Sequence, residues 1–209
     1  MKLLLAALFA LISFTASADP QPGVEYNLTQ QIIPTDNPAK VEVVELFWYG
    51  CPHCHDLEPI LNTWVSKLPK DVVFKRIPGI PRPDWVPAAK AWYALEALGL
   101  TEKLHGAFFD AIHKQKSVKP NDDAGIIDWI AKQGGVDHKK VEEAYNSFSS
   151  NTKIMRASQI FRASGATGVP TLLIEGKYIT GPTMAGGGLE SLKVADYLIE
   201  KARKEKAAK

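Results

Sequence analysis

Two cysteines separated by two residues, Cys51 and Cys54, are the side chains of this sequence best suited to chemistry. They are the only cysteines in 209 residues. As a structural staple the pair is badly placed, because closing so small a loop contributes roughly 2 kcal/mol in a chain-entropy model, against about 3 kcal/mol for a 15-residue loop. We therefore expect a Cys51–Cys54 disulfide that is made and broken as a reagent, which is the chemistry of thiol-disulfide exchange.

The residues around the pair favour negative charge on sulfur, and only a thiolate is a good sulfur nucleophile or leaving group. Cys51 stands where a helix is predicted to begin, so free backbone N–H groups and the helix dipole stabilise an anion there. Pro52 suits the first helical turn, and His53 can donate a hydrogen bond or carry positive charge beside the thiolate. A stabilised thiolate also makes the disulfide more oxidising. We expect Cys51 to be the sulfur that is attacked and later leaves as the stabilised thiolate, and Cys54 to be its less exposed partner.

The elements that position the dithiol follow from hydrophobic periodicity. Residues 41–49 are rich in β-branched and aromatic side chains and predict a buried strand that ends at Gly50. From Pro52 to Leu68 the apolar residues follow a helical period. Residues 71–77 predict a second strand, and a β-α-β unit normally has parallel strands and a right-handed crossover.

The rest of the chain predicts a helical block followed by a hairpin and a last helix. Helices are predicted at 84–98, 101–114, 121–133, 137–148 and 151–164. Strands at 171–174 and 177–180 are joined by a tight turn at Glu175-Gly176, and a final helix covers 189–204. This order indicates an α/β fold in which an all-helical domain, residues 82–165, is inserted into a domain formed by 19–81 and 166–209.

The first 18 residues have the composition of a secretory signal peptide. Lys2 gives a positive start, residues 3–14 are almost wholly apolar, and Ala16-Ser17-Ala18 is a small-residue cleavage site. A membrane anchor is the rival interpretation, but a spanning helix needs about 20 apolar residues. We expect cleavage after Ala18 and export of the remaining chain.

The length allows a stable core, and the net charge excludes two classes of partner. About 190 residues remain after cleavage, which is enough to bury a sizeable core. The formal net charge of +2 provides no general field to attract nucleic acid or acidic lipid, so we expect neither as a partner.

Glu45 stands out because it interrupts an otherwise apolar strand six residues before Cys51. Burying an unpaired carboxylate is costly, so two interpretations remain open. In one, Glu45 is a buried proton relay next to Cys54, with Lys75 on the following strand as its partner. In the other, it faces solvent. The remaining histidines form no motif with one another, so we expect surface histidines or buried ones with satisfied hydrogen bonds: His55, His105, His113 and His138.

Four segments together resemble the DsbA family of periplasmic disulfide oxidoreductases. They are Phe47 to Cys54 (FWYGCPHC), Tyr145 to Phe148 (YNSF), Gly168 to Thr171 (GVPT) and Glu175 to Tyr178 (EGKY). The resemblance spans nearly the whole chain after residue 18, and it implies a thioredoxin fold with a helical insertion. It also implies a cis Pro170 facing the dithiol, with the backbone of Val169 pairing with an extended client peptide.

The resemblance further implies a function and its partners. The expected function is donation of the Cys51–Cys54 disulfide to reduced, cysteine-containing exported proteins during oxidative folding in the periplasm. A DsbB-like membrane protein is the expected reoxidant, and no cofactor or metal is expected. His55, directly after Cys54, departs from the family pattern without breaking the motif.

Three alternatives come from the same residues. Cys51 to His55 also satisfies C-x-x-C-H, the attachment motif of c-type haem, which would make the protein an electron carrier. A metal site could use both cysteines and a histidine. A disulfide isomerase or reductase is the rival within the oxidoreductases, but exported isomerases of this kind carry an N-terminal dimerisation domain. Only some twenty residues lie between the leader and the first predicted strand, so we expect a monomer.

Overall fold

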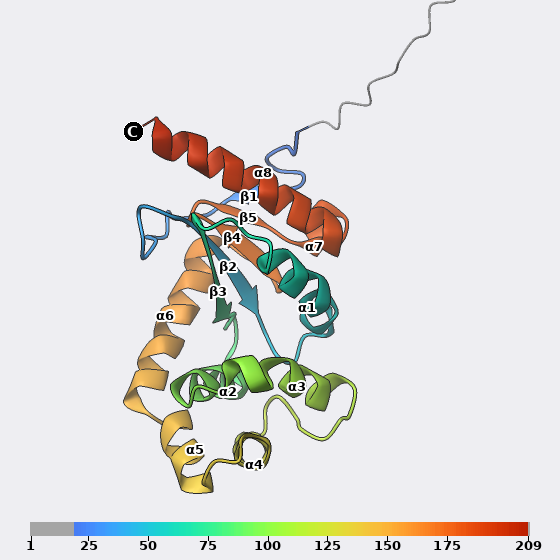
Figure 1. Ribbon diagram of the computed structural model, residues 1–209, viewed down its shortest axis with the longest axis vertical. Helices are drawn as coiled ribbons and strands as arrows, with labels where there is room; N and C mark the ends of the chain where they lie inside the picture. The colour runs from blue at the N-terminus through green and yellow to red at the C-terminus, as the bar shows by residue number, and fades with distance from the viewer. Residues whose placement is uncertain (1–18, 209) are drawn as a thin grey trace, which may run out of the picture.

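The computed structural model describes residues 19–208 and is built on one mixed five-stranded sheet (Figure 1). Its strand order is β1-β5-β4-β2-β3. β2 and β3 are parallel, which confirms the predicted β-α-β unit, and the other neighbours are antiparallel. The strands are β1 (Asn27–Leu28), β2 (Val41–Phe47), β3 (Val72–Pro78), β4 (Thr171–Ile174) and β5 (Tyr178–Thr180).

The helices follow the predicted order, with a helical block between β3 and β4. They are α1 (Pro52–Val65), α2 (Val86–Ala97), α3 (Thr101–His113), α4 (Asp123–Gly134), α5 (His138–Tyr145), α6 (Phe148–Ser164), α7 (Pro182–Ala185) and α8 (Gly188–Ala207), with a 3-10 turn at Pro83–Trp85. Two elements were not predicted. The strand β1 is only two residues long, too short to show a pattern, and it forms by pairing with β5. The short helix α7 lies between β5 and the predicted last helix.

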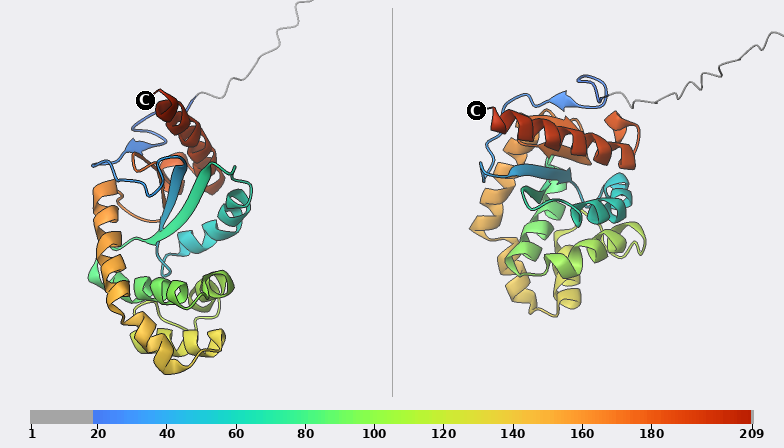
Figure 2. Two further views of the ribbon diagram at one scale, coloured as in Figure 1. Left: turned by 60° about the vertical axis from the view of Figure 1, so that its left-hand side comes forward. Right: turned by 45° about the horizontal axis from the view of Figure 1, so that its top comes forward.

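Both faces of β2 are buried, as its mainly apolar sequence predicts. Val43 packs in the cluster that α1 and α8 form on one face of the sheet. Val44 and Leu46 point the other way and pack against Phe161 of α6. Figure 2 shows α6 running from the helical block along the sheet, on the side away from α8. The order of elements and these layers are those expected of a thioredoxin fold with a helical insertion.

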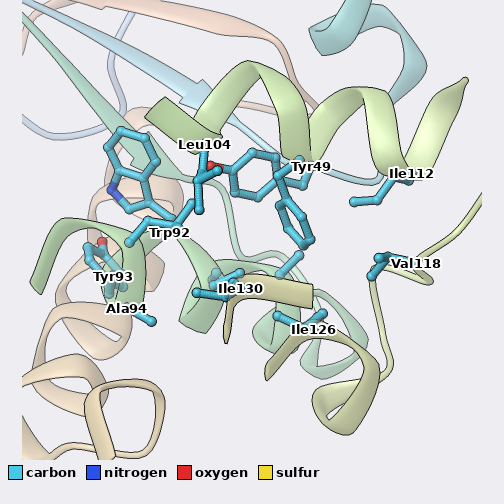
Figure 3. Close-up of a cluster of buried hydrophobic side chains, with 14 of the residues drawn as sticks. Tyr49, Trp92, Tyr93, Ala94, Leu104, Ile112, Val118, Ile126 and Ile130 are labelled. Atoms are coloured by element: carbon cyan, nitrogen blue, oxygen red, sulfur yellow. The ribbon is translucent and has the colours of Figure 1, made fainter. Parts of the chain in front are cut away.

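The helical block is joined to the sheet by an aromatic residue that leaves the end of β2. The predicted strand extended to Tyr49, but β2 ends at Phe47, and the side chain of Tyr49 enters the core of the block (Figure 3). Its ring lies 4.6 Å from the ring of Phe108 and 4.8 Å from that of Phe109, both on α3. Burial of these rings holds the segment that leads to Cys51 against the block.

The predicted hairpin turn between β4 and β5 is present and requires glycine. Both turn residues, Glu175 and Gly176, have positive φ angles, of 53° and 62°. A Cβ atom on Gly176 would lie 1.8 Å from the carbonyl oxygen of Ile33. The turn therefore needs a glycine at its second position, both for its conformation and for this close approach.

Residues 1–18, and with them the predicted signal peptide and its cleavage site, lie outside the described part of the chain. Among residues 19–208, no helix combines the length and the apolar composition that crossing a bilayer requires.

Candidate active site

The dithiol lies at the junction between the sheet and the helical block, where the sequence placed it. β2 ends at Phe47, and Cys51 is the N-cap residue of α1, with Pro52 in the first turn. Both cysteines are free thiols. Cys51 is 8% exposed and Cys54 is fully buried, so only Cys51 presents its sulfur to a reactant.

The turn before Cys51 is held by two stacked indoles. The Trp48 ring lies parallel to that of Trp85, with centroids 4.1 Å apart. The Trp48 ring also covers Gly50, where a Cβ atom would approach it to 2.4 Å. Gly50 is therefore required for the close approach that fixes the turn, and the backbone N–H of Cys51 donates to the carbonyl oxygen of Trp48 at 3.0 Å.

The two thiols differ in acidity. A hydrogen bond from the Cys54 thiol is the largest cause that lowers the pKa of Cys51, to about 6, against the opposing effect of burial. Backbone N–H groups of Cys54 and His53 and the charge of His53 add to it. Burial raises the pKa of Cys54 well above its usual value, as do its hydrogen bond to Cys51 and the negative charges of Cys51 and Glu45. At neutral pH the reduced site is therefore a Cys51 thiolate beside a Cys54 thiol.

This ranking of causes can be measured. Iodoacetamide should alkylate Cys51 of the reduced protein with a midpoint near pH 6. Cys54→Ala should raise that midpoint more than His53→Ala, because the Cys54 hydrogen bond lowers the pKa of Cys51 more than the charge of His53 does. Mass spectrometry of samples quenched at each pH gives the rates. A larger shift in His53→Ala would contradict the ranking.

The segment Val169-Pro170 faces the dithiol from the start of β4. Its peptide bond is cis, and Sγ of Cys51 lies 3.4 Å from the carbonyl oxygen of Val169. Beside it a groove of about 560 Å³ is floored mainly by apolar side chains. The lining residues are His53, Asp56, Leu57, Ile60, Val169, Pro170, Pro182, Thr183, Gly188, Leu189 and Glu190. Val169 and Pro170 line this groove, so it opens next to the peptide whose carbonyl oxygen contacts Cys51.

Glu45 is fully buried, so the solvent-facing interpretation is wrong. Its Oε2 accepts a hydrogen bond from Nε of Arg76 on β3, at 3.0 Å. Lys75, the partner suggested by the sequence, instead binds Asp36 and Glu42, each at 2.5 Å. The strand register explains the correction, because Glu45 is paired with Arg76 and adjacent residues of β3 point to opposite faces.

A second carboxyl group shares the guanidinium of Arg76. Nη2 of Arg76 lies 3.3 Å from Glu58 of α1, which is 6% exposed. Burial, followed by the negative charge of Glu58, raises the pKa of Glu45 to about 8 despite Arg76. Glu45 therefore carries a proton at pH 7. A negative charge on Glu45 raises the pKa of Cys54, so the protonation states of these two groups depend on each other.

Sequence reasoning missed Glu58, Arg76 and His105 as members of this buried network. Glu58 could have been identified from the sequence as a neighbour of Cys54, since it lies four residues later and shares the same face of the helix. Nε2 of His105, on α3, is 3.2 Å from Oε1 of Glu58, and Nδ1 is 2.8 Å from the hydroxyl of Tyr49. Nothing in the local sequence marks His105, because its neighbours in space come from distant segments.

The other three histidines have polar partners, as the sequence analysis expects. His55 binds Asp110 at 2.9 Å, and Nε2 of His113 lies 2.7 Å from the carbonyl oxygen of Tyr49. His138 binds Asp128 on the surface at 3.0 Å. Within residues 19–208, no three His, Cys, Asp or Glu side chains are grouped so that they could hold a metal ion.

Comparisons with known proteins agree on one family for this chain. A family model described as a DSBA-like thioredoxin domain matches residues 76–192. The thiol:disulfide interchange protein DsbA of Burkholderia cepacia is 38% identical over 99% of this chain and 100% of that protein. The protein of the same name from Pseudomonas aeruginosa is 41% identical over 97% of both chains.

Solved structures agree with the sequence comparison. The crystal structure of Pseudomonas aeruginosa DsbA superimposes with a TM-score of 0.82 at 42% identity, covering 90% of this chain and 96% of that one. The oxidoreductase NmDsbA1 from Neisseria meningitidis gives a TM-score of 0.79 at 26% identity, covering 91% and 99%. The likeness therefore includes the sheet and the helical block together.

Proposed function

This chain belongs to the DsbA family of thiol-disulfide oxidoreductases, and from that premise we propose that it is an exported oxidant that donates its Cys51–Cys54 disulfide to reduced proteins. The observation that carries the proposal is the unequal acidity of the two thiols. A thiolate stabilised in the reduced state favours reduction of the enzyme and therefore oxidation of the client.

The reaction consists of two exchanges. A client thiolate attacks Sγ of Cys51, a bond forms between these two sulfurs, and the Cys51–Cys54 bond breaks with its electron pair on Cys54. A second client thiolate then attacks the client sulfur of the mixed disulfide, and Cys51 leaves as the thiolate. The client loses two electrons and the dithiol gains them.

Glu45 supplies the proton that the first exchange needs. Cys54 leaves as a basic thiolate in a buried site, since its pKa is raised well above the usual value. Glu45, with a pKa raised by burial to about 8, is protonated at neutral pH and can pass its proton to that sulfur. Pro52 and His53 act at the start of α1, where they help to hold the Cys51 thiolate that leaves in the second exchange.

Val169 and Pro170 form the binding side of the site. The position of the Val169 carbonyl next to Cys51 supports backbone pairing with an extended client, and the apolar groove beside it supports contact with client side chains. Such binding depends mainly on the client's backbone, which suits an enzyme that acts on many exported proteins.

The cellular setting follows from the leader and the family. Residues 1–18 serve as a signal peptide that is cleaved after Ala18, and the enzyme works in the periplasm as a monomer. A DsbB-like membrane protein reoxidises the dithiol. Residues 19–81 and 166–209 form the thioredoxin-like domain, and residues 82–165 form the inserted helical domain.

The equilibrium of the dithiol with glutathione tests the proposal. The expected reduction potential lies well above that of thioredoxin, which is about −270 mV, because the stabilised Cys51 thiolate favours the reduced form. Thiol trapping measures the reduced fraction at each ratio of reduced to oxidised glutathione. A potential at or below that of thioredoxin would instead indicate a reductase. Haem staining of protein made with the haem-maturation machinery checks the C-x-x-C-H alternative, and we expect no stain.

A further inference from the structure

The buried carboxyl pair Glu45 and Glu58 holds two acids next to one guanidinium. If both were ionised, the pair and Arg76 would leave one uncompensated negative charge in the protein interior, which is costly. One proton therefore resides on the pair at neutral pH, and its place matters for the reaction. On Glu45 it removes the negative charge that acts on Cys54, whereas on Glu58 it lies next to His105 of α3.

We propose that His105 is a positioning residue that holds Glu58 as the ionised member of the pair and so keeps the shared proton on Glu45. The inference rests on the proposed function, because it matters only if Glu45 exchanges a proton with Cys54. It assigns a part in the reaction to a side chain whose polar contacts are with Tyr49 and Glu58.

The hydrogen bonds of His105 determine which of its ring nitrogens carries the proton. Burial raises the pKa of Tyr49 well above its usual value, so the hydroxyl keeps its hydrogen and can donate it to Nδ1 of His105, 2.8 Å away. The opposite tautomer would turn an unprotonated Nε2 toward the Glu58 carboxylate, so the proposal takes the hydroxyl as the donor. Burial lowers the pKa of His105, so its ring is neutral at pH 7. A neutral ring that accepts at Nδ1 carries its hydrogen on Nε2, which faces Oε1 of Glu58 at 3.2 Å.

Three groups surround Glu58 with hydrogen or positive charge, where Glu45 has one. Asn62 donates to it at 3.0 Å and Arg76 at 3.3 Å, and Nε2 of His105 lies 3.2 Å from its Oε1 in an ion-pair contact, outside the geometry of a hydrogen bond. Burial alone would raise the pKa of Glu58, but these groups bring it below the usual value. Glu45 has only the Arg76 hydrogen bond, and its Oε1 is buried without a partner among residues 19–208. Donors favour the ionised acid, so the proton goes to Glu45.

Charged and titratable groups face the pair from every element packed against it. β2 provides Glu45 and β3 provides Arg76, while α1 provides Cys54 and Glu58, with Cys51 as its N-cap residue. α3 provides His105 and the negative charge of Glu102, and the turn before α1 provides Tyr49. Among these, His105 is the neutral side chain that links the helical block to the carboxyl pair. Removing it therefore changes how the shared proton is distributed between Glu45 and Glu58 without removing a charge.

Site-resolved titration of the side-chain carboxyls by carbon-13 NMR tests the proposal on the reduced full chain. Glu45→Gln and Glu58→Gln assign the two signals. In His105→Phe, the midpoint of Glu45 should fall by about one pH unit or more and that of Glu58 should rise, because Nε2–H no longer faces the ionised Glu58 carboxylate. His105→Gln keeps a donor toward Glu58 and should restore most of the wild-type titration.

A double-variant comparison separates this role from a general loss of packing. With Glu58→Gln in place, adding His105→Phe should leave the Glu45 midpoint unchanged, because there is no longer an ionised partner to hold. An equal shift with and without Glu58→Gln would overturn the proposal, and so would a Glu45 midpoint that is the same in wild type and His105→Phe.

The wild-type protein provides a test that does not depend on the folding of any variant. Nitrogen-15 spectra of His105 should show a neutral ring with its hydrogen on Nε2 at pH 7, whereas a hydrogen on Nδ1 would refute the inference. The glutathione equilibrium of the same wild-type sample tests the proposed function separately. An oxidising potential with an Nδ1 tautomer would reject only His105, and a reducing potential with an Nε2 tautomer would reject only the oxidant function.

Discussion

Cys51→Ser should lose all measurable disulfide transfer to a reduced client, while Cys54→Ser should accumulate mixed disulfides. Cys51 holds the only sulfur of the pair with any exposure, so without it no client can reach the dithiol. In Cys54→Ser the Cys51 thiolate remains, and the internal thiol that would release a bound partner is gone. Refolding of a reduced, disulfide-containing client measures the first effect, and intact-mass spectrometry after exposure to oxidised glutathione measures the second.

The two variants should differ in whether glutathione adds to the remaining cysteine. Cys51→Ser retains Cys54, which is fully buried and has a pKa raised by burial, so glutathione should not add to it. If Cys51→Ser gained the mass of one glutathione as readily as Cys54→Ser, the assignment of Cys51 as the attacked sulfur would be wrong.

Arg76→Met should destabilise the protein by about 3 kcal/mol or more near pH 8, because breaking a buried ion pair leaves an uncompensated charge. Arg76 lies against both buried carboxyl groups, and its own side chain is only 14% exposed. Urea denaturation of the reduced protein gives the free energy of unfolding for both forms.

The loss of stability should depend on pH with a definite sign. The pKa of Glu45 is raised by burial from 4.5 to about 8, so the folded protein binds more protons than the unfolded chain between those values. Stability then falls as pH rises through this range. Arg76 limits that fall, since its charge opposes the increase in the pKa. The difference between wild type and Arg76→Met should therefore be smaller at pH 5 than at pH 8.

Lys75→Met is the matched control for this experiment. Lys75 is the adjacent residue of the same strand and also binds two carboxylates, Asp36 and Glu42, but its side chain is 31% exposed. Partly exposed ion pairs contribute about 1 kcal/mol or less. An equal loss of unfolding free energy in Lys75→Met and Arg76→Met would mean that burial of the Glu45 site does not increase the contribution of Arg76 to stability.

The dithiol and its immediate setting could be predicted because they depend on residues close together in the chain. The β-branched run before Gly50 indicates a strand, and Pro52 and the apolar period after it indicate a helix. These local preferences place Cys51 at a helix N-terminus in any fold that retains both elements. The hairpin at Glu175-Gly176 is local in the same sense, because a two-residue turn with positive φ angles favours glycine.

The surroundings of Glu45 were decided by the tertiary structure. Sequence alone left its burial open and suggested Lys75, because two neighbouring basic residues of β3 cannot be told apart without the register. The register faces Arg76 toward Glu45 and turns Lys75 to the other side of the sheet. Burial then raises the pKa of Glu45, and burial is a property of the packed layers.

The residues that complete the site come from segments brought together only by folding. His105 is 47 residues beyond Glu58 in the sequence and meets it because α3 packs beside α1. Val169 reaches Cys51 through the pairing of β4 with β2. The sequence by itself thus determined which two sulfurs react and which of them is stabilised as a thiolate. Which acid holds the proton, and what faces the reacting sulfur, depended on strand register and helix packing, because distances between remote residues exist only in the folded chain.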